Sequence, residues 1–235
     1  GLESYVADGL VWAIDQGANV VNMSLQYNVG SEYLHAAVQY AAAHGVPMIA
    51  ATGNSNGAVS WPAKWDETIA VAGSNRFDAR YSVSNFGPEV DVTACGEAVY
   101  SLALNNGYAT RSGTSMAAPH VTGTIALMRA LYPTMSAGAI RTVLMQTARD
   151  LAPTGYDIYT GAGVINAGAA VLMAQSMNPG PADMNGDGVV DGVDLTTFFS
   201  QWGVCSGCNC TADFNHDCVV NAVDMSYLLS AWSTQ

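Results

Sequence analysis

Basic residues are scarce in this sequence, and those present stop well before its end. Only 7 of the 235 residues are Lys or Arg, against 19 Asp or Glu, and the last of the seven is Arg149. The net charge of -12 at pH 7 argues against nucleic acid and anionic membranes as partners and favours cations. The acidic excess is greatest beyond residue 182, where seven Asp occur without a single Lys or Arg.

Long apolar runs are also missing. The most apolar stretch, residues 116–131, is interrupted by Pro119, His120 and Arg129, so we expect no membrane span in this chain. Half of the residues are nevertheless apolar and only 11% are charged. This composition indicates a well-buried globular chain, long enough for one sizeable domain and a small one.

Cysteine is nearly absent from the first two hundred residues. Cys95 is the only one there, whereas Cys205, Cys208, Cys210 and Cys218 fall within fourteen residues. Such clustering favours two disulfides and an oxidising compartment, and therefore a secreted or cell-surface protein. A zinc site on the same four thiols is the alternative.

Helical patterns alternate with short apolar strands in the first part of the chain. We expect helices over residues 3–17, 31–44, 114–132 and 136–148, and strands over Val20–Leu25, Pro47–Thr52, Thr68–Gly73 and Val90–Ala94. This rhythm predicts an α/β fold with right-handed crossovers and a parallel sheet covered on both faces. Two prolines and a glycine in Ser176–Ala182 predict a linker.

Beyond this linker the sequence repeats itself with a shift of 30 residues. An acidic loop that begins at Asp183 returns at Asp213, and each loop is followed by apolar residues at the spacing of one helix face. Neither helix can bury its apolar stripe without the other. Residues 183–235 are therefore predicted to form one small all-α module of two loop–helix units.

The segment GTSMAAPHV, residues 113–121, places a serine at the start of a predicted helix. Small neighbours of Ser115 allow the backbone to approach a substrate, and Pro119 suits a first turn, where its missing N–H costs little. A hydroxyl at a helix N-terminus lies beside free N–H groups and the positive end of the helix dipole, which favours a developing oxyanion. Simple helix capping by Ser115 is the alternative for this segment taken alone.

Taken whole, GTSMAAPHV matches the nucleophile motif of the subtilases, the subtilisin-like serine proteases. The resemblance extends from about residue 6 to about residue 175, and its motifs are VVNMSL (20–25), ATGN (51–54), SWPA (60–63), SNFGP (84–88) and GAGVIN (161–166). It implies that residues 1–175 are the C-terminal part of a subtilisin-like peptidase domain. The implied activity is endopeptidase hydrolysis of polypeptides through an acyl-enzyme on Ser115.

The resemblance also assigns roles to individual residues. It makes Ser115 the nucleophile and a backbone oxyanion donor, and Asn54 the side-chain oxyanion donor. The substrate-binding positions that it implies are Ser24, Leu25, Gln26, Ala51, Thr52 and Gly53. The first three match the strand that pairs with the substrate backbone, and the last three match a wall of the primary specificity pocket. The family usually has Gly-Gly where this chain has Gln26-Tyr27, so the substrate preference of the family does not transfer.

A serine nucleophile needs a base, and the base needs an acid that fixes its tautomer. In subtilases both precede the serine, and no Asp-Thr-Gly or Asp-Ser-Gly occurs here. His35, His44 and His120 align with segments that the family does not use for this purpose. We therefore expect the Asp and His blocks to precede Gly1 and the chain alone to be inactive. A noncatalytic relative that keeps the fold for binding is the alternative function.

The two acidic loops have the spacing of calcium-binding loops, with oxygens at positions 1, 3, 5, 9 and 12 and a backbone carbonyl at position 7. The predicted ligands are Asp183, Asn185, Asp187, Val189, Asp191 and Asp194 in the first loop and Asp213, Asn215, Asp217, Val219, Asn221 and Asp224 in the second. Cys218 replaces Gly188 in the second loop, which we expect to bind calcium more weakly. The tandem units resemble the dockerin family, which implies a cohesin-like partner. A calcium-stabilised cell-surface appendage is the alternative.

Overall fold

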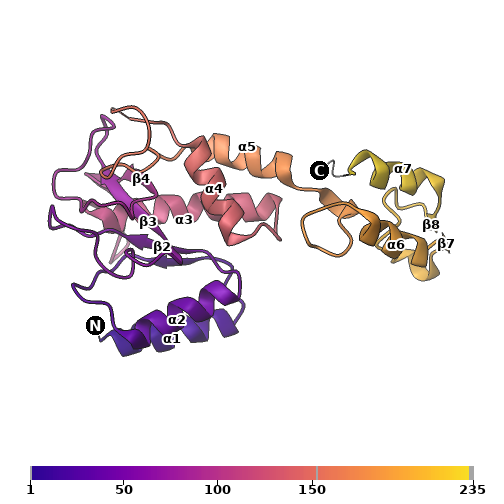
Figure 1. Ribbon diagram of the computed structural model, residues 1–235, viewed down its shortest axis with the longest axis horizontal. Coiled ribbons are helices and arrows are strands. Elements are labelled where there is room, and N and C mark those ends of the chain that lie inside the picture. Colours follow the sequence, from indigo (N-terminus) through magenta and orange to yellow (C-terminus); the bar gives the residue numbers. More distant parts are fainter. Residues whose placement is uncertain (1, 152, 233–235) are drawn as a thin grey trace. The chain divides into compact units, whose positions relative to one another are not determined.

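The computed structural model describes residues 2–151 and 153–232, which form two compact units (Figure 1). The first unit runs to Ala130 and resumes over Ser136–Met173, and the second takes in Leu131–Met135 and the chain from Ala174 onward. Helix α5 (Ala167–Met177) extends two residues into the predicted linker, and a 3-10 turn occupies Gly180–Ala182.

A four-stranded parallel sheet forms the centre of the first unit. Its strands are β1 (Val21–Met23), β2 (Met48–Ala51), β3 (Thr68–Ser74) and β4 (Val92–Cys95), in the order β1-β2-β3-β4. All three pairings are parallel, with Met23 opposite Ala50 in the first pair. The α/β fold with a parallel sheet predicted from the sequence is confirmed.

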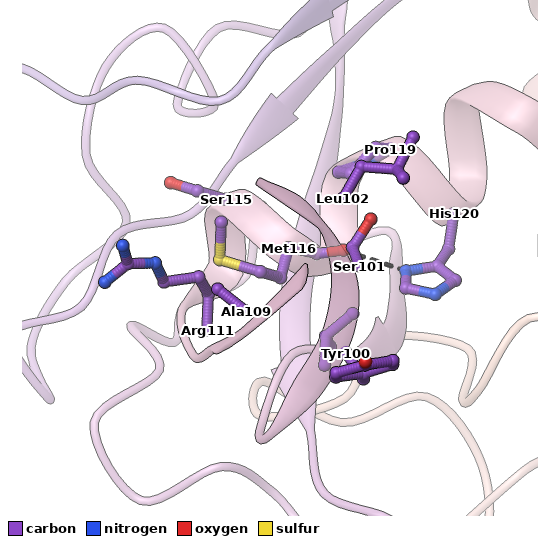
Figure 2. A pocket seen from close by; sticks show the side chains of 10 residues that line it. Tyr100, Ser101, Leu102, Ala109, Arg111, Ser115, Met116, Pro119 and His120 are labelled. Atoms are coloured by element: carbon purple, nitrogen blue, oxygen red, sulfur yellow. Dashed lines mark hydrogen bonds between the residues drawn. The ribbon is translucent and has the colours of Figure 1, made fainter. Parts of the chain in front are cut away.

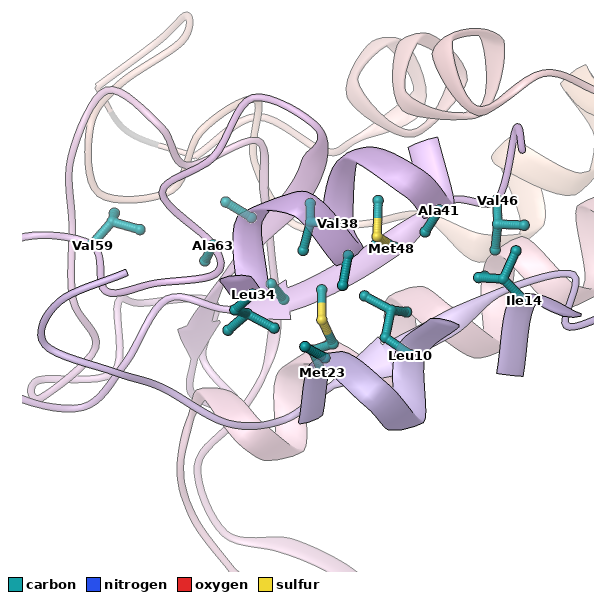
Figure 3. Close-up of a cluster of buried hydrophobic side chains, with 14 of the residues drawn as sticks. Leu10, Ile14, Met23, Leu34, Val38, Ala41, Val46, Met48, Val59 and Ala63 are labelled. Atoms are coloured by element: carbon teal, nitrogen blue, oxygen red, sulfur yellow. The ribbon is translucent and has the colours of Figure 1, made fainter. Parts of the chain in front are cut away.

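Helices α1 (Glu3–Asp15) and α2 (Glu32–Ala43) lie together on one side of this sheet (Figures 1 and 3). Ser31 starts α2 by accepting a hydrogen bond from the backbone N–H of Leu34. Leu34 and Val38 of α2 are fully buried in a cluster with Met48 and Ala50, which point to the same face because strand residues alternate. This packing fixes where the carboxyl ends of β1 and β2 lie.

Helices α3 (Thr114–Leu131) and α4 (Ala137–Thr147) lie on the other side of the sheet (Figure 1). An ion pair attaches α4 to the strands, because Arg141 Nη2 lies 3.0 Å from Asp91 Oδ2 and also donates to the carbonyl oxygen of Thr68. The same carboxylate accepts the N–H of Ala70 at 2.8 Å. Burial raises the pKa of Asp91 above its ordinary value, and the charge of Arg141 only partly opposes that rise.

An antiparallel hairpin leads into α3. Strands β5 (Val99–Ala103) and β6 (Gly107–Arg111) are joined through Asn105 and Asn106, which both have positive φ, at 60° and 55°. The sequence analysis did not predict this hairpin. Its Tyr100 and Leu102 are exposed, so the alternation of apolar and polar residues that marks a half-buried strand is missing.

The second unit has a helix after each acidic loop, α6 (Gly192–Ser200) and α7 (Ala222–Ser230). Phe198 and Leu228 from the two helices are fully buried in one core with Val190 and Val220. The structure adds a two-residue antiparallel pair that was not predicted, β7 (Gly203–Val204) with β8 (Val219–Val220).

The four clustered cysteines form two disulfides, Cys205–Cys210 and Cys208–Cys218. A zinc site on these thiols, the alternative from the sequence, is therefore not what the structure contains. A 3-10 turn at Ser206–Cys208 brings the chain back toward β8. Within the described parts of the chain, no helix combines the length and the apolar character needed to cross a bilayer.

Candidate active site

Ser115 lies in the first turn of α3, against the segment that leaves β1. Its hydroxyl donates to the carbonyl oxygen of Ser24 at 3.3 Å, and the hydroxyl of Ser24 donates to the carbonyl oxygen of Ser115 at 2.8 Å. The first N–H groups of a helix have no partners within the helix. The serine is thus held at the carboxyl end of a parallel strand, beside free backbone donors.

Asn54 follows β2 and is oriented by Thr114, the residue before the serine. The side-chain oxygen of Asn54 accepts the N–H of Thr114 at 2.8 Å and its hydroxyl at 3.3 Å. The hydroxyl of Thr114 in turn accepts the N–H of Gly53 at 3.1 Å. The oxygen of Asn54 is held in this way, whereas its amide nitrogen has no hydrogen-bond partner among the described residues. An oriented, unused donor of this kind can stabilise an oxyanion.

Gln26 connects the two predicted substrate-binding segments. Its side-chain oxygen accepts the backbone N–H of Asn54 at 3.1 Å. Gly53 has a φ of +106°, and a Cβ there would meet the side chains of Asn85, Gln26 and Ser60 at 2.4 to 2.9 Å. Position 53 therefore requires glycine, both for its backbone angle and for the close approach of these side chains.

The remaining predicted substrate-binding residues face the interior. Leu25 packs against the core under α1 and α2, and Ala51 and Thr52 are buried at the end of β2. The backbone N–H of Thr52 donates to the carbonyl oxygen of Val71, and the carbonyl oxygen of Thr52 accepts the backbone N–H of Ser60. The side chains of these three residues support the site from behind.

Asn85 holds the turn that carries Asn54 and is 1% exposed. Its oxygen accepts the N–H groups of Ser55 at 2.8 Å and Gly57 at 3.2 Å, and its nitrogen donates to the carbonyl oxygen of Thr52 at 3.0 Å. Sequence reasoning assigned no role to Asn85 or Thr114. Both residues lie in the motifs SNFGP and GTSMAAPHV, and membership of these motifs is the signal that could have identified them. Neither the residue type nor the spacing along the chain predicts that a polar side chain is buried.

A cavity of about 390 Å³ lies on the other side of Ser115 (Figure 2). It is formed by the β5–β6 hairpin and the start of α3, and its lining includes Ser115, Met116, Arg111, Tyr100 and His120. The space adjoins Ser115 on the side of the hairpin. It is large enough for a peptide side chain, although no particular ligand follows from its lining.

No histidine of the described residues is hydrogen-bonded to Ser115. His120 bonds through Nδ1 to the carbonyl oxygen of Met116 at 2.8 Å, the contact drawn in Figure 2. His35 lies 3.2 Å from a carboxylate oxygen of Glu67, and His44 bonds to the backbone of its own helix. The described residues thus bring together the predicted nucleophile Ser115 and the predicted oxyanion donor Asn54 without a hydrogen-bonded base.

The two acidic loops of the second unit have matching hydrogen-bond patterns. Asp183 accepts backbone N–H groups from the third, fourth and fifth residues after it, and Asp213 accepts them from the fourth and fifth. Asp194 and Asp224 are fully buried, and each accepts two N–H groups near the loop start and one at the helix start. The sequence repeat is therefore also a repeat of local structure.

The two acidic loops are rich in oxygen ligands, carry buried carboxylates and have no Lys or Arg nearby in the sequence. Hard cations such as calcium prefer ligands of this chemistry. However, no three His, Cys, Asp or Glu side chains of the described residues are placed around one point as metal ligands. The calcium sites therefore stay a prediction. Cys218 has a φ of +69° where Gly188 has +89°, so the second loop holds a non-glycine residue in a left-handed conformation.

Comparison with known proteins decides the family. Residues 1–163 match the model of the subtilase family, peptidase S8. This chain belongs to the subtilase family. It is 42% identical over 175 residues to subtilisin DY of Bacillus licheniformis, which covers 72% of this chain and 63% of that protein. It is 40% identical over 171 residues to alkaline elastase YaB of Bacillus sp. strain YaB, covering 72% of this chain and 44% of that protein.

Solved structures agree with this family. A protease from Pseudoalteromonas arctica PAMC 21717 superimposes with a TM-score of 0.66 at 31% identity, over 74% of this chain and 59% of that one. The prenylagaramide maturation protease PagA has a TM-score of 0.68 at 24% identity, over 74% and 68% of the two chains, and supports the fold alone. The predicted serine peptidase family is confirmed. This chain spans less than two thirds of the length of the two Bacillus relatives, and the dockerin-like prediction for residues 183–235 stays a prediction.

Proposed function

We propose that this chain carries the nucleophile, the oxyanion site and part of the substrate-binding surface of a subtilisin-like serine endopeptidase. The observation that carries the proposal is that the side-chain oxygen of Asn54 accepts both the N–H and the hydroxyl of Thr114, the residue directly before Ser115, which orients the Asn54 amide group next to the first turn of α3. Family membership supplies the chemistry, and polypeptides are the substrates.

In this mechanism Ser115 Oγ attacks the carbonyl carbon of the scissile peptide bond. A histidine base, oriented by an aspartate, takes the serine proton, and both come from a part of the protein outside these 235 residues. The tetrahedral oxyanion accepts hydrogen bonds from the Ser115 N–H and from the side-chain N–H of Asn54. The C–N bond then breaks as the histidine protonates the leaving amine, and water hydrolyses the ester on Ser115.

The described residues place no base at Ser115, and this is the observation that favours the noncatalytic alternative. The two functions differ in one measurable outcome. We expect the intact protein to hydrolyse peptide substrates, and Ser115→Ala to lower kcat to the background while peptide binding persists. Ser226→Ala, which removes an exposed hydroxyl from α7, is the matched control and should leave kcat unchanged. An intact protein that binds peptides but never cleaves them would support the noncatalytic function instead.

For residues 183–235 we propose a calcium-binding module of a secreted or cell-surface protein. Its ligands are those of the two acidic loops, named above, with the second loop the weaker. The matching loop geometry, the lack of Lys and Arg and the two disulfides support this proposal. A cohesin-like docking partner and a calcium-stabilised appendage are equal alternatives for this module, and a pull-down with a cohesin module, with and without a calcium chelator, decides between them.

A further inference from the structure

Two tyrosine–aspartate hydrogen bonds join α1 and α2 at the surface of the first unit. The hydroxyl of Tyr33 donates to Asp8 Oδ1 at 2.6 Å, and the hydroxyl of Tyr40 donates to Asp15 Oδ1 at 2.7 Å. The partners step by seven residues in the same direction on both helices, so α1 and α2 run parallel, side by side (Figure 1). Seven residues make about two helical turns, which places the two pairs about 10.5 Å apart along one face.

A cavity of about 220 Å³ lies between the two helices at this face, and we call it the α1–α2 groove. Small and apolar side chains line it, among them Val11, Ala36 and Ala37, and the rings of Tyr33 and Tyr40 line it as well. Tyr33 is 57% exposed and Tyr40 is 36% exposed, so both rings are accessible to a ligand. The groove therefore offers an aromatic ring and a carboxylate at each of two positions, two turns apart.

The charges around the groove favour a cation. Helices α1 and α2 contain four acidic residues, Glu3, Asp8, Asp15 and Glu32, and neither Lys nor Arg. Asp15 is the last residue of α1, at the negative end of the helix dipole, where a carboxylate is unfavourable and a cation is favoured. The parallel helix α2 ends beside it without a basic residue in its last turn. The stability of the helices therefore does not explain a carboxylate at this position, whereas a cationic ligand would.

Each aspartate of the groove keeps one oxygen for a ligand. Asp8 Oδ1 and Asp15 Oδ1 accept the tyrosine hydroxyls, and no described residue bonds to Oδ2 of either. These hydrogen bonds raise the pKa of Tyr33 and of Tyr40 above the ordinary value, so the hydroxyls stay protonated and the negative charge stays on the carboxylates. A guanidinium or ammonium group can thus meet a charged oxygen and an aromatic ring together, and both attract it.

We propose that the α1–α2 groove binds a cationic segment of a partner protein in the polyproline II conformation, with Lys or Arg at two positions three residues apart. A polyproline II helix has three residues per turn and rises about 3.1 Å per residue, so side chains i and i+3 lie on one face about 9.3 Å apart. Long basic side chains from these positions can reach both tyrosine–aspartate pairs. In a β-strand the same side chains would point to opposite faces. Aromatic-lined grooves bind polyproline II segments because such segments are already extended and lose little entropy.

The test uses the intact protein with Ser115→Ala, so that no peptide is cleaved, and three fluorescently labelled proline-rich peptides. The first peptide has two Arg three residues apart, and the second has the same composition with the two Arg adjacent. In the third, citrulline, a neutral analogue of Arg, replaces both. In fluorescence anisotropy the first peptide should bind most tightly, and its Kd should rise with salt concentration because the charges involved are exposed.

Variants of the groove locate the binding. Asp8→Asn combined with Asp15→Asn removes both charges but keeps an acceptor for each tyrosine hydroxyl, and it should raise the Kd of the first peptide by about 2- to 30-fold, because an exposed ion pair contributes up to about fivefold. The control combines Glu32→Gln with Asp66→Asn, which removes the same charge from exposed positions that do not line the groove, and its Kd should stay close to that of the parent.

Three results would refute the inference. They are equal binding of the citrulline peptide, equal binding of the peptide with adjacent Arg, and a Kd that changes equally in the groove variant and the control. The measurement involves no cleavage, so each of these results would leave the proposed peptidase function standing.

Discussion

The hydroxyl of Thr114 makes two contacts in the candidate active site, and removing it should have two separate effects. Thr114 is fully buried, and Thr114→Val keeps its shape while deleting the hydroxyl. The buried N–H of Gly53 then loses its acceptor, now at 3.1 Å. An unsatisfied buried donor costs about 1–3 kcal/mol, so we expect the free energy of unfolding to fall by that amount. For a domain of this size, each kcal/mol lowers Tm by about 2–4 °C.

The second effect is on catalysis in the intact protein. Asn54 loses the 3.3 Å bond from the hydroxyl but keeps the 2.8 Å bond from the Thr114 N–H. A net hydrogen bond contributes about 0.5–1.5 kcal/mol, which corresponds to a fall in kcat of about 2- to 13-fold if its loss is felt only in the transition state. KM should change little, because the oxyanion forms after substrate binding.

Denaturant unfolding and steady-state kinetics measure the two effects on the same sample. Thr142→Val is the matched control, because Thr142 is exposed on α4 and its hydroxyl bonds only to the carbonyl oxygen of Gly138. This control should change the unfolding free energy by less than about 0.5 kcal/mol. A Thr114→Val protein with unchanged stability and unchanged kcat would refute the role given to this hydroxyl.

Gly53→Ala should lower the free energy of unfolding, measured with denaturant, by about 1–3 kcal/mol, because the added Cβ would lie 2.4 Å from a side-chain atom of Asn85. The control Gly123→Ala lies in open space on α3 and should raise the unfolding free energy by about 0.5–1 kcal/mol. Equal effects of the two substitutions would contradict the packing described. Because the pKa of Asp91 is raised in the folded protein, protonation of Asp91 adds to the free energy of unfolding. This contribution is complete below the ordinary pKa of 3.8 and is lost as the pH rises through the pKa of the folded protein. The unfolding free energy of Asp91→Asn relative to wild type should therefore increase over that pH range, and a flat difference would contradict the shift. Calorimetry should show that Asp183→Ala loses more calcium affinity than Asp213→Ala, and an absence of calcium heat in the wild-type chain would overturn the calcium sites.

Strong local patterns made the sheet and its helices predictable. The apolar runs at 20–25 and 47–52 contain β1 and β2, with ends that differ by one or two residues, and the run at 68–73 covers β3 except its last residue, Ser74. The hairpin of β5 and β6 was not predicted because its side chains are mostly exposed and carry no burial pattern. The signal that could have revealed it is the Asn105-Asn106-Gly107 turn, since Asn and Gly favour the positive φ values that a tight hairpin requires.

The candidate active site was predictable only as a set of residues. The motifs named Ser115 and Asn54, but the roles of Thr114 and Asn85 depend on contacts between residues 28 to 61 positions apart, which spacing along the chain does not encode. Gln26 was visible as a departure from the family pattern. That its carboxamide reaches Asn54 follows from the parallel pairing of β1 and β2, and so from the folded chain.

The central claim is that Ser115 is the nucleophile of a subtilase active site whose base lies outside these residues. Mass spectrometry after treatment with a fluorophosphonate, which reacts with activated serines, tests it most directly. The intact protein should be labelled stoichiometrically within minutes at Ser115, and the 235-residue chain should not be labelled on that timescale. Brisk labelling of Ser115 in the 235-residue chain, or labelling of the intact protein at a different serine, would contradict the account.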